Sequence, residues 1–173
     1  MNPIIGVFAD GGCIARNPSP IGGTWAWCAV DTAGQRVLCQ SGVHVQPGGG
    51  VTNNEMEYFA LVDALATLAD HAPGWSGPVH SDSQVSIGRI FWGWRLTGIP
   101  DAWQTRLASA LGRLGTLTPV LLDGHPTRAQ LATGIGKRGH PVSPWNVWCD
   151  RACREAGERY LTAARPREQA SVR

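Results

Sequence analysis

The sequence predicts an α/β domain in which helices cover both faces of a mixed five-stranded sheet. Three segments rich in apolar and β-branched residues open the chain, an amphipathic helix follows them, and short apolar strands then alternate with helices. The resulting order, βββαβααβα, is typical of a mixed sheet packed between helices. The 173 residues fit one domain, which we place over residues 1–165, followed by a flexible tail over 166–173.

The first three strands are predicted over residues 4–9, 24–30 and 35–45. The first ends at an Asp-Gly-Gly turn, the second reads TWAWCAV, and the third follows the polar turn DTAGQ. We expect these three consecutive strands to pair antiparallel.

A helix is predicted to begin after Thr52. Thr52 is followed three residues later by Glu55, which is the pattern of a capping box. Apolar residues then recur at helical spacing, and this face is expected to pack on the sheet. Its members are Ala60, Leu61, Ala64, Leu65 and Leu68.

The second half of the chain contributes the remaining strands and helices. A loop rich in Gly and Pro, about twenty residues long, is expected before the last helix. In order, we predict a strand over 78–82, helices over 84–92 and 101–114, a strand over 118–122 and a helix over 146–164.

Composition excludes several classes of protein. Hydrophobic residues make up 43% and charged residues 16% of the chain, which is typical of a globular protein rather than a disordered or fibrous one. No apolar run approaches the roughly 18 residues that cross a bilayer, and the N-terminal segment lacks the basic start of a secretory signal. Five cysteines without a Cys-x-x-Cys pair indicate neither a disulfide framework nor a zinc site. We therefore expect a cytoplasmic protein without membrane contacts.

Charge is unevenly distributed along the chain. Residues 1–88 carry two Arg and seven acids, whereas residues 89–173 carry thirteen basic residues and six acids. This polarity is compatible with a polyanion bound beside metal-binding carboxylates, but it also occurs in proteins that bind no anion.

Four acids stand where packing alone does not explain them. Asp10 ends the first strand and precedes two glycines, which allow the main chain to approach a ligand closely. A simple turn has the same pattern. Glu57 heads the apolar face of the first helix, where its charge needs a cation or a hydrogen-bond donor. A salt bridge to a nearby Arg is the alternative for Glu57.

The other two acids lie in the second half of the fold. Asp82 follows a buried strand and precedes a helix, the position at which open α/β sheets display functional groups. An N-cap role is the alternative for Asp82. Asp150 is expected in the first turn of the last helix, where a negative charge is also simply stabilising.

Four segments together resemble type 1 ribonuclease H. FADGGCIARNPSPIGG is similar to its first strand and loop, TNNEMEYFALVDAL to its first helix, HSDSQ to the strand end that follows, and NVWCDRAC to its last helix. They occur in the order and spacing of that family and cover most of the chain. The resemblance implies an RNase H-like fold and an endonuclease that hydrolyses the RNA strand of RNA/DNA hybrids, leaving 5′-phosphate and 3′-hydroxyl ends.

The resemblance also assigns residues. It implies that Asp10, Glu57, Asp82 and Asp150 bind two Mg²⁺ ions, for which Mn²⁺ can substitute, and that these acids are catalytic. We expect a monomer whose partner is the hybrid. The implied nucleic-acid contacts are Gly11, Gly12, Cys13, Asn17, Thr52, Asn53, Asn54, Gln84 and Trp103.

Two histidines are candidates for the catalytic histidine that the resemblance implies. In the family a Gly-His pair directly follows the last strand and precedes the helix Asp by ten residues. Here Gly124-His125 meets the first condition and Gly139-His140 the second, because fifteen extra residues separate the two pairs. We favour His125, since a strand end positions a side chain better than the middle of a loop. Lys137 and Arg138 in this loop could approach phosphate.

One departure concerns the basic helix and loop with which many family members hold the DNA strand. The corresponding segment here is only FWGWRLTGIPDAWQ. Trp92 and Trp94 could stack on the substrate, although half-buried core is the better expectation for Trp92. Substrate binding is then expected to be weaker or to depend on other basic groups. The candidates are Arg95, Arg106, Arg113 and the loop before the last helix.

Two other functions remain open from the sequence. One is a nuclease of the same superfamily that acts on DNA or branched structures, which the Asn and Gln residues argue against. The other is a catalytically weak or silent module that binds hybrids, against which the presence of all four acids weighs.

Overall fold

The structure is a computed structural model that describes residues 2–46 and 49–170 of the chain. Its five strands form one sheet in the order β3-β2-β1-β4-β5. β1, β2 and β3 pair antiparallel, whereas β4 and β5 run parallel to β1, so the predicted mixed sheet is confirmed. The strands are β1 (Ile4–Cys13), β2 (Gly22–Asp31), β3 (Arg36–Val45), β4 (Gly77–Ser81) and β5 (Leu117–Leu121).

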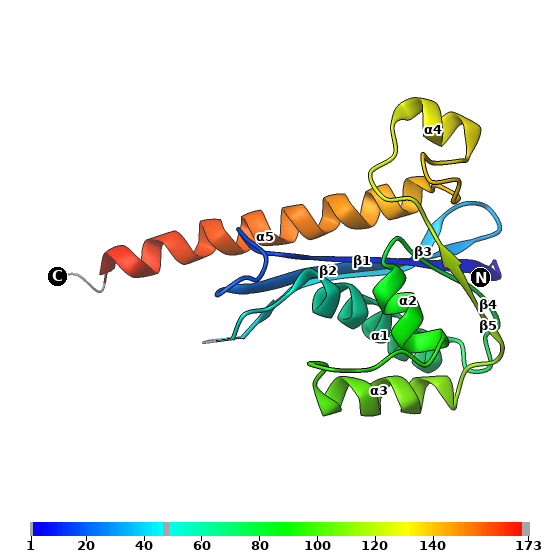
Figure 1. Ribbon diagram of the computed structural model, residues 1–173, viewed down its shortest axis with the longest axis horizontal. Coiled ribbons are helices and arrows are strands. Elements are labelled where there is room, and N and C mark those ends of the chain that lie inside the picture. The colour runs from blue at the N-terminus through cyan, green and yellow to red at the C-terminus, as the bar shows by residue number, and fades with distance from the viewer. Residues whose placement is uncertain (1, 47–48, 171–173) are drawn as a thin grey trace.

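Helices cover both faces of this sheet, as predicted. Figure 1 shows α5 along one face and α1, α2 and α3 on the other. The helices are α1 (Asn53–His71), α2 (Gln84–Phe91), α3 (Asp101–Leu111), α4 (Arg128–Thr133) and α5 (Pro144–Ala170).

Alternating side chains of the central strands feed two hydrophobic clusters. On the side of α1 and α3, the strand residues Val7, Ala9, Trp27 and Ala29 pack with the apolar face of α1. On the side of α5, the cluster contains Phe8, Ala26, Cys28, Val30, Leu122, Cys149, Ala152 and Cys153. Because β1 and β2 contribute to both clusters, their backbones are fixed from both sides, which makes the centre of β1 a rigid place for a functional group.

The structure differs from the sequence prediction after β5. The segment predicted as a loop contains a short helix, α4, whose signals were hidden by the Gly- and Pro-rich composition. Thr127 caps α4 through a capping box with Gln130, and Gly134 ends the helix at φ 77°. α5 begins at Pro144, two residues earlier than predicted, since the hydroxyl of Ser143 accepts a hydrogen bond from the Trp145 N–H.

The end of α5 also differs from the prediction. The described backbone stays helical to Ala170, whereas the sequence pattern ended the helix at residue 164. Residues 171–173 of the predicted tail lie outside the described residues. The division into one domain over 1–165 and a tail over 166–173 therefore stays a prediction. Across the described residues, the helices are all too short or too polar to span a bilayer.

A buried carboxylate joins three elements on the α1 side of the sheet. Asp63 of α1 accepts a 2.8 Å hydrogen bond from the indole N–H of Trp27 on β2 and pairs at 2.7 Å with Arg106 of α3. Its side chain is only 8% exposed, so both contacts are needed to stabilise its charge. The periodicity of α1 could not predict this pair, because its partners are distant in sequence.

We predict that Asp63→Ala lowers the free energy of unfolding by about 2–4 kcal/mol, since it leaves the Trp27 N–H buried without an acceptor. Asp70→Ala is the matched control, because Asp70 makes a comparable 2.6 Å pair with Arg113 but is 64% exposed. The control should change stability by less than about 1 kcal/mol in urea unfolding. Equal losses in the two variants would contradict the assigned role of Asp63.

Candidate active site

The four predicted acids come from four elements that meet beside the centre of β1. Asp10 lies in β1, which continues three residues past it to Cys13 rather than ending there as predicted. Glu57 is in α1, and Asp82 directly follows β4. Asp150 lies in the second turn of α5, not the first, because the helix begins at Pro144.

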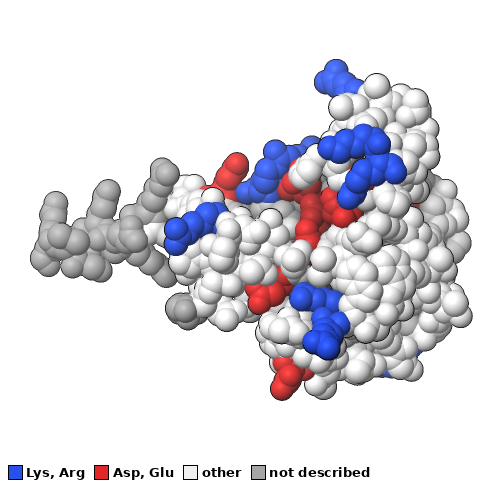
Figure 2. Space-filling view, in the orientation of Figure 1, with Lys and Arg blue, Asp and Glu red and all other residues white. Residues whose placement is uncertain are grey.

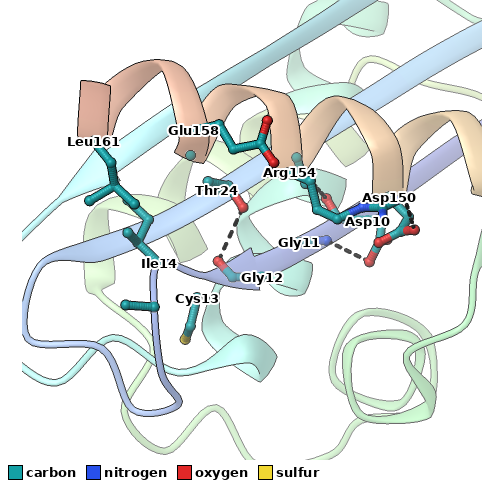
Figure 3. A pocket seen from close by; sticks show the side chains of 13 residues that line it. Asp10, Gly11, Gly12, Cys13, Ile14, Thr24, Asp150, Arg154, Glu158 and Leu161 are labelled. Atoms are coloured by element: carbon teal, nitrogen blue, oxygen red, sulfur yellow. Dashed lines mark hydrogen bonds and ion pairs between the residues drawn. The ribbon is translucent and has the colours of Figure 1, made fainter. Parts of the chain in front are cut away.

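Two cavities expose three of these acids. Asp10 and Asp150 line one of about 250 Å³ between β1 and α5, which Figure 3 shows together with Arg154 and Glu158. Asp82 and Asp150 line a second one of about 280 Å³ together with His125. Asp150 therefore lines both cavities, whereas Glu57 lines neither of them.

Gly11 brings β1 close to α1. A Cβ at this position would overlap the backbone of Met56 and Glu57. Only glycine permits this approach, which sets the Asp10 and Glu57 backbones side by side. The neighbouring Gly12 differs, because the nearest atom to a Cβ there is the Thr24 hydroxyl at an ordinary 3.7 Å.

Burial and repulsion raise the pKa values of Asp10, Glu57 and Asp82. Burial and then the charge of Asp82 raise the pKa of Asp10 well above its usual value, with smaller effects of Glu57 and Asp150. The Gly11 N–H, 2.7 Å from the Asp10 Oδ1, opposes this shift. Burial also raises the pKa of Glu57 to about 7 and that of Asp82 above its usual range. The four carboxylates thus share one electrostatic site.

The donor set fits a hard divalent cation. Four carboxylates that repel one another would be stabilised by added positive charge, and Mg²⁺ prefers oxygen ligands. Among the described residues, however, no three His, Cys, Asp or Glu side chains already have the close spacing of a metal centre. Asp150 instead pairs with Arg154 at 3.1 Å. Binding a cation would compete with this ion pair and draw the side chains together.

The structure separates the two candidate histidines. His125 follows β5, lines the cavity with Asp82 and Asp150, and lowers the pKa of Asp82 through its charge. His140 lies in the inserted segment, where its carbonyl accepts a hydrogen bond from Gly136, and its charge acts on Asp123 instead. The geometry therefore favours His125, in agreement with the sequence argument.

Four of the predicted nucleic-acid contacts form one polar cluster. The Asn53 Oδ1 accepts a 2.9 Å hydrogen bond from the Cys13 N–H, and the Asn17 Oδ1 accepts from the Asn53 N–H at 3.3 Å. The Thr52 hydroxyl contacts the Glu55 carboxylate at 2.7 Å, so this side chain is engaged in the predicted capping box. The loop after β1 and the start of α1 are thus joined by their own polar groups.

The other predicted contacts take no part in these hydrogen bonds. Asn54 and Gln84 are exposed in the first turns of α1 and α2, and Gly12 lines the cavity between β1 and α5. Trp103 is half-buried, with its ring 4.7 Å from that of Phe59.

The tryptophans of the short segment after α2 differ from expectation. Trp92 is 47% exposed and not part of the core, and it makes an edge contact with Trp94, itself 42% exposed. A Cβ at Gly88 would overlap the Trp94 ring, so the close packing of that ring on α2 needs glycine there. The pattern of the short apolar segment could not distinguish this surface pair from core.

Sequence reasoning missed three residues of the site. The buried Asn146 side chain hydrogen-bonds to Asp82 and lowers the pKa of that acid, while its own Oδ1 lacks a partner in the described structure. Ser83 lowers the pKa of Glu57 in the same way and also caps α2. The third is Arg154, which pairs with Asp150. The i, i+4 spacing of Asn146 and Arg154 about Asp150 on α5 was the available signal.

Comparisons with known proteins agree with this geometry. A protein named ribonuclease H from Nitratidesulfovibrio vulgaris is 31% identical over 151 residues, which are 83% of this chain and 82% of that protein. Another from Chlorobium chlorochromatii is 28% identical over 158 residues, covering 90% of this chain and 97% of its own length. No family model matches the chain.

Solved structures show the same fold. The RNase H1 of Halobacterium salinarum superimposes with a TM-score of 0.60 at 23% identity, covering 90% of this chain and 98% of its own. LC11-RNase H1, solved in complex with an RNA/DNA hybrid, gives a TM-score of 0.60 at 19% identity with the same coverage.

The fold and the acidic site define a nuclease of the RNase H-like class. The chain belongs to the ribonuclease H family, so the predicted family, fold and endoribonuclease class are confirmed.

We predict that Gly11→Ala lowers the free energy of unfolding by about 1–3 kcal/mol, because the added methyl group forces β1 away from α1. The matched control is Gly12→Ala, which should change it by less than about 1 kcal/mol, since only the Thr24 hydroxyl lies near. Urea unfolding of the two variants makes the comparison. A Gly11→Ala protein as stable as wild type would show that the close approach is not needed.

Glu57 should make metal-free stability depend on pH. Its pKa of about 7 exceeds the value of 4.5 expected in the unfolded chain, so the folded state binds the proton more tightly. Its contribution is therefore present below about pH 4.5 and is lost as the pH rises towards 7. In buffer with EDTA, Glu57→Gln should stabilise the protein at pH 8 by on the order of 2 kcal/mol and less at pH 5. Urea midpoints that differ equally at both pH values would refute this.

Proposed function

We propose that this chain is an endonuclease that hydrolyses the RNA strand of RNA/DNA hybrids with two Mg²⁺ ions, leaving 5′-phosphate and 3′-hydroxyl ends. The observation that carries the proposal is the shared electrostatic site of four carboxylates from β1, α1, the end of β4 and α5, in which burial and then the charge of Asp82 raise the pKa of Asp10. Membership in the ribonuclease H family supports the reaction. The RNA/DNA hybrid bound to LC11-RNase H1 supports a hybrid as the substrate of this chain.

Asp10, Glu57, Asp82 and Asp150 would hold the ions, with Mn²⁺ as a substitute. When bound, the ions supply Lewis-acid activation of the attacking water and stabilisation of the leaving 3′ oxygen. The chain's own contribution is to hold these carboxylates on rigid elements and to keep the Asp10 and Glu57 backbones close through Gly11.

His125 is the proposed catalytic histidine. It lies in the cavity with Asp82 and Asp150, where an imidazole can carry a proton to or from the reacting oxygens near neutral pH. Asn146 would keep the Asp82 carboxylate oriented through its hydrogen bond. His140 is then a residue of the inserted segment rather than of the site.

Polar residues would select RNA over DNA. Amide groups both donate and accept hydrogen bonds, so they can recognise a 2′-hydroxyl group. Asn17, Asn53, Asn54 and Gln84 are the candidates, while Gly11, Gly12, Cys13 and Thr52 would let backbone approach the hybrid and Trp103 would lie near the DNA strand. Figure 2 shows acidic side chains gathered near the middle of one face of the molecule, with Lys and Arg above and below them, an arrangement that is compatible with a polyanion bound beside metal ions.

The proposal predicts cleavage of only one substrate. End-labelled RNA/DNA hybrid, double-stranded RNA and double-stranded DNA are incubated with the protein in Mg²⁺ or in EDTA. The hybrid alone should be cut, only with Mg²⁺, and Asp82→Asn should lower the rate on the order of a thousandfold. Asp70→Asn, an exposed acid distant from the site, is the control and should leave the rate unchanged.

Each of the other possible results of this experiment would indicate a different function. Binding of the hybrid without cleavage would indicate a silent binding module, and cleavage of double-stranded DNA would indicate a structure-specific nuclease. A rate unaffected by EDTA would refute the role of the ions. The cytoplasmic location and the monomeric state stay predictions, and size-exclusion chromatography with light scattering tests the latter.

A further inference from the structure

The segment between β5 and α5 is a folded insertion. α4 is capped at its start by Thr127 and ends at Gly134, and an isolated bridge pairs Ile135 with Pro141. Inside that bridge, the Gly136 N–H donates a 2.9 Å hydrogen bond to the His140 carbonyl. Figure 1 shows α4 projecting beyond the sheet at the end where α5 begins. The insertion therefore has a defined shape and a defined place of attachment.

The attachment is a buried carboxylate at the end of β5. Asp123, whose side chain is only 4% exposed, accepts hydrogen bonds from the Arg138 backbone N–H at 2.7 Å and from the Arg138 Nε at 2.6 Å. The Arg138 guanidinium also donates to the Leu122 carbonyl at 3.3 Å, and the Asp123 N–H donates to Pro141 at 2.9 Å. Arg138 is thus bound to protein rather than held ready for phosphate.

Close packing and charge strengthen this attachment. A Cβ at Gly136 would overlap the Asp123 side chain, so the insertion lies directly on the carboxylate. Burial acts to raise the pKa of Asp123, but the hydrogen bonds and charge of Arg138 more than offset it and lower the pKa below its usual value. The pair therefore stabilises the charged form of a side chain that the insertion covers.

His125 lies two residues after Asp123 and has a strained backbone. Its φ of 50° lies in the left-handed region, which residues other than glycine rarely adopt. Gly124, immediately before it, lies against the Asp82 carboxylate, where a Cβ would overlap Oδ2. Such a conformation persists only when the surrounding structure fixes it. Gly124 contacts Asp82, and Asp123 carries the attached insertion, so both contacts lie within the two residues before His125.

We infer that Asp123 and Arg138 are positioning residues for His125: by holding the insertion on the end of β5, the pair keeps His125 in its left-handed conformation beside Asp82 and Asp150. The inference rests on the proposed function, in which His125 moves a proton. Neither residue of the pair lines the cavity that contains His125. Both therefore act through the histidine and not on the substrate.

A kinetic comparison separates positioning from direct substrate contact. Arg138→Gln and Asp123→Asn should lower kcat for the hybrid by roughly tenfold to a hundredfold and leave KM within about twofold. Arg138→Lys retains the charge and the backbone hydrogen bond and should recover part of the loss. Asp70→Asn is the matched control, because it weakens an Arg–Asp pair of the same 2.6 Å length, between Asp70 of α1 and Arg113, and should leave kcat unchanged. A rise in KM with unchanged kcat would mean that Arg138 contacts the substrate and would overturn the inference.

A double-mutant cycle with His125→Ala tests whether the effect passes through the histidine. Arg138→Gln should lower kcat in the wild-type background and have no further effect in the His125→Ala background. Equal losses in both backgrounds would overturn the inference, and so would a His125→Ala protein with wild-type kcat, although cleavage of the hybrid would still support the proposed function.

A measurement independent of activity completes the test. The imidazole NMR signal of His125, assigned from the His125→Ala spectrum, should shift or broaden in Arg138→Gln and stay in place in Asp70→Asn. An unchanged signal in Arg138→Gln would overturn the inference even if the protein cleaved no hybrid. Circular dichroism of both variants verifies that they are folded, which the 51% exposure of Arg138 leads us to expect.

Discussion

Repulsion among four carboxylates is the constraint on which the rest of the structure depends. Asp10 is half-buried and loses much of its solvation, and the charges of Asp82, Glu57 and Asp150 all act on it, so the group is unfavourable for the folded chain taken alone. The fold tolerates it because β1 is fixed on both faces by the two hydrophobic clusters. The stability lost at the acidic site is thus supplied by the core, as is usual for sites that a ligand later completes.

Small residues and neutral hydrogen-bond donors let the four acids come together without disrupting the hydrophobic core. Gly11 lets β1 approach α1, and Gly124 lets the end of β5 approach Asp82. Asn146 and Ser83 donate hydrogen bonds that favour the charged forms of Asp82 and Glu57 without adding a cation. A positive side chain in their place would neutralise the acids permanently and leave less charge to attract a divalent ion. Around Asp82 and Glu57 the site therefore keeps its negative charge available for a metal ion, whereas at Asp150 the ion would compete with Arg154.

The sequence predicted the order of the strands and of most helices, because this order depends on local patterns such as a capping box and the apolar face of α1. The sequence also singled out the four acids, whose catalytic role stays a prediction, although β1 continues past Asp10. It did not predict α4, whose capping box lies in a segment rich in Gly and Pro. It also could not predict the Asp63–Arg106 and Asp123–Arg138 pairs, since each joins elements far apart in sequence or across an insertion. The choice between His125 and His140 needed the place of the insertion relative to β5, which spacing alone left open.

The ion pairs also limit how the chain can hold a nucleic acid. Arg106, Arg113 and Arg138 were candidates to replace the missing basic helix, yet each is paired at 2.6–2.7 Å with Asp63, Asp70 or Asp123. An arginine that already neutralises an acid adds little net attraction for phosphate, because breaking its pair would expose the charge of its partner. The nucleic acid is therefore attracted mainly by cations that have no acidic partner in the described structure, among them Arg95, Arg128 and Lys137. Because Arg106, Arg113 and Arg138 are engaged in these pairs, the polar cluster at the start of α1 and the exposed Trp92–Trp94 pair gain weight as the surfaces that position the substrate.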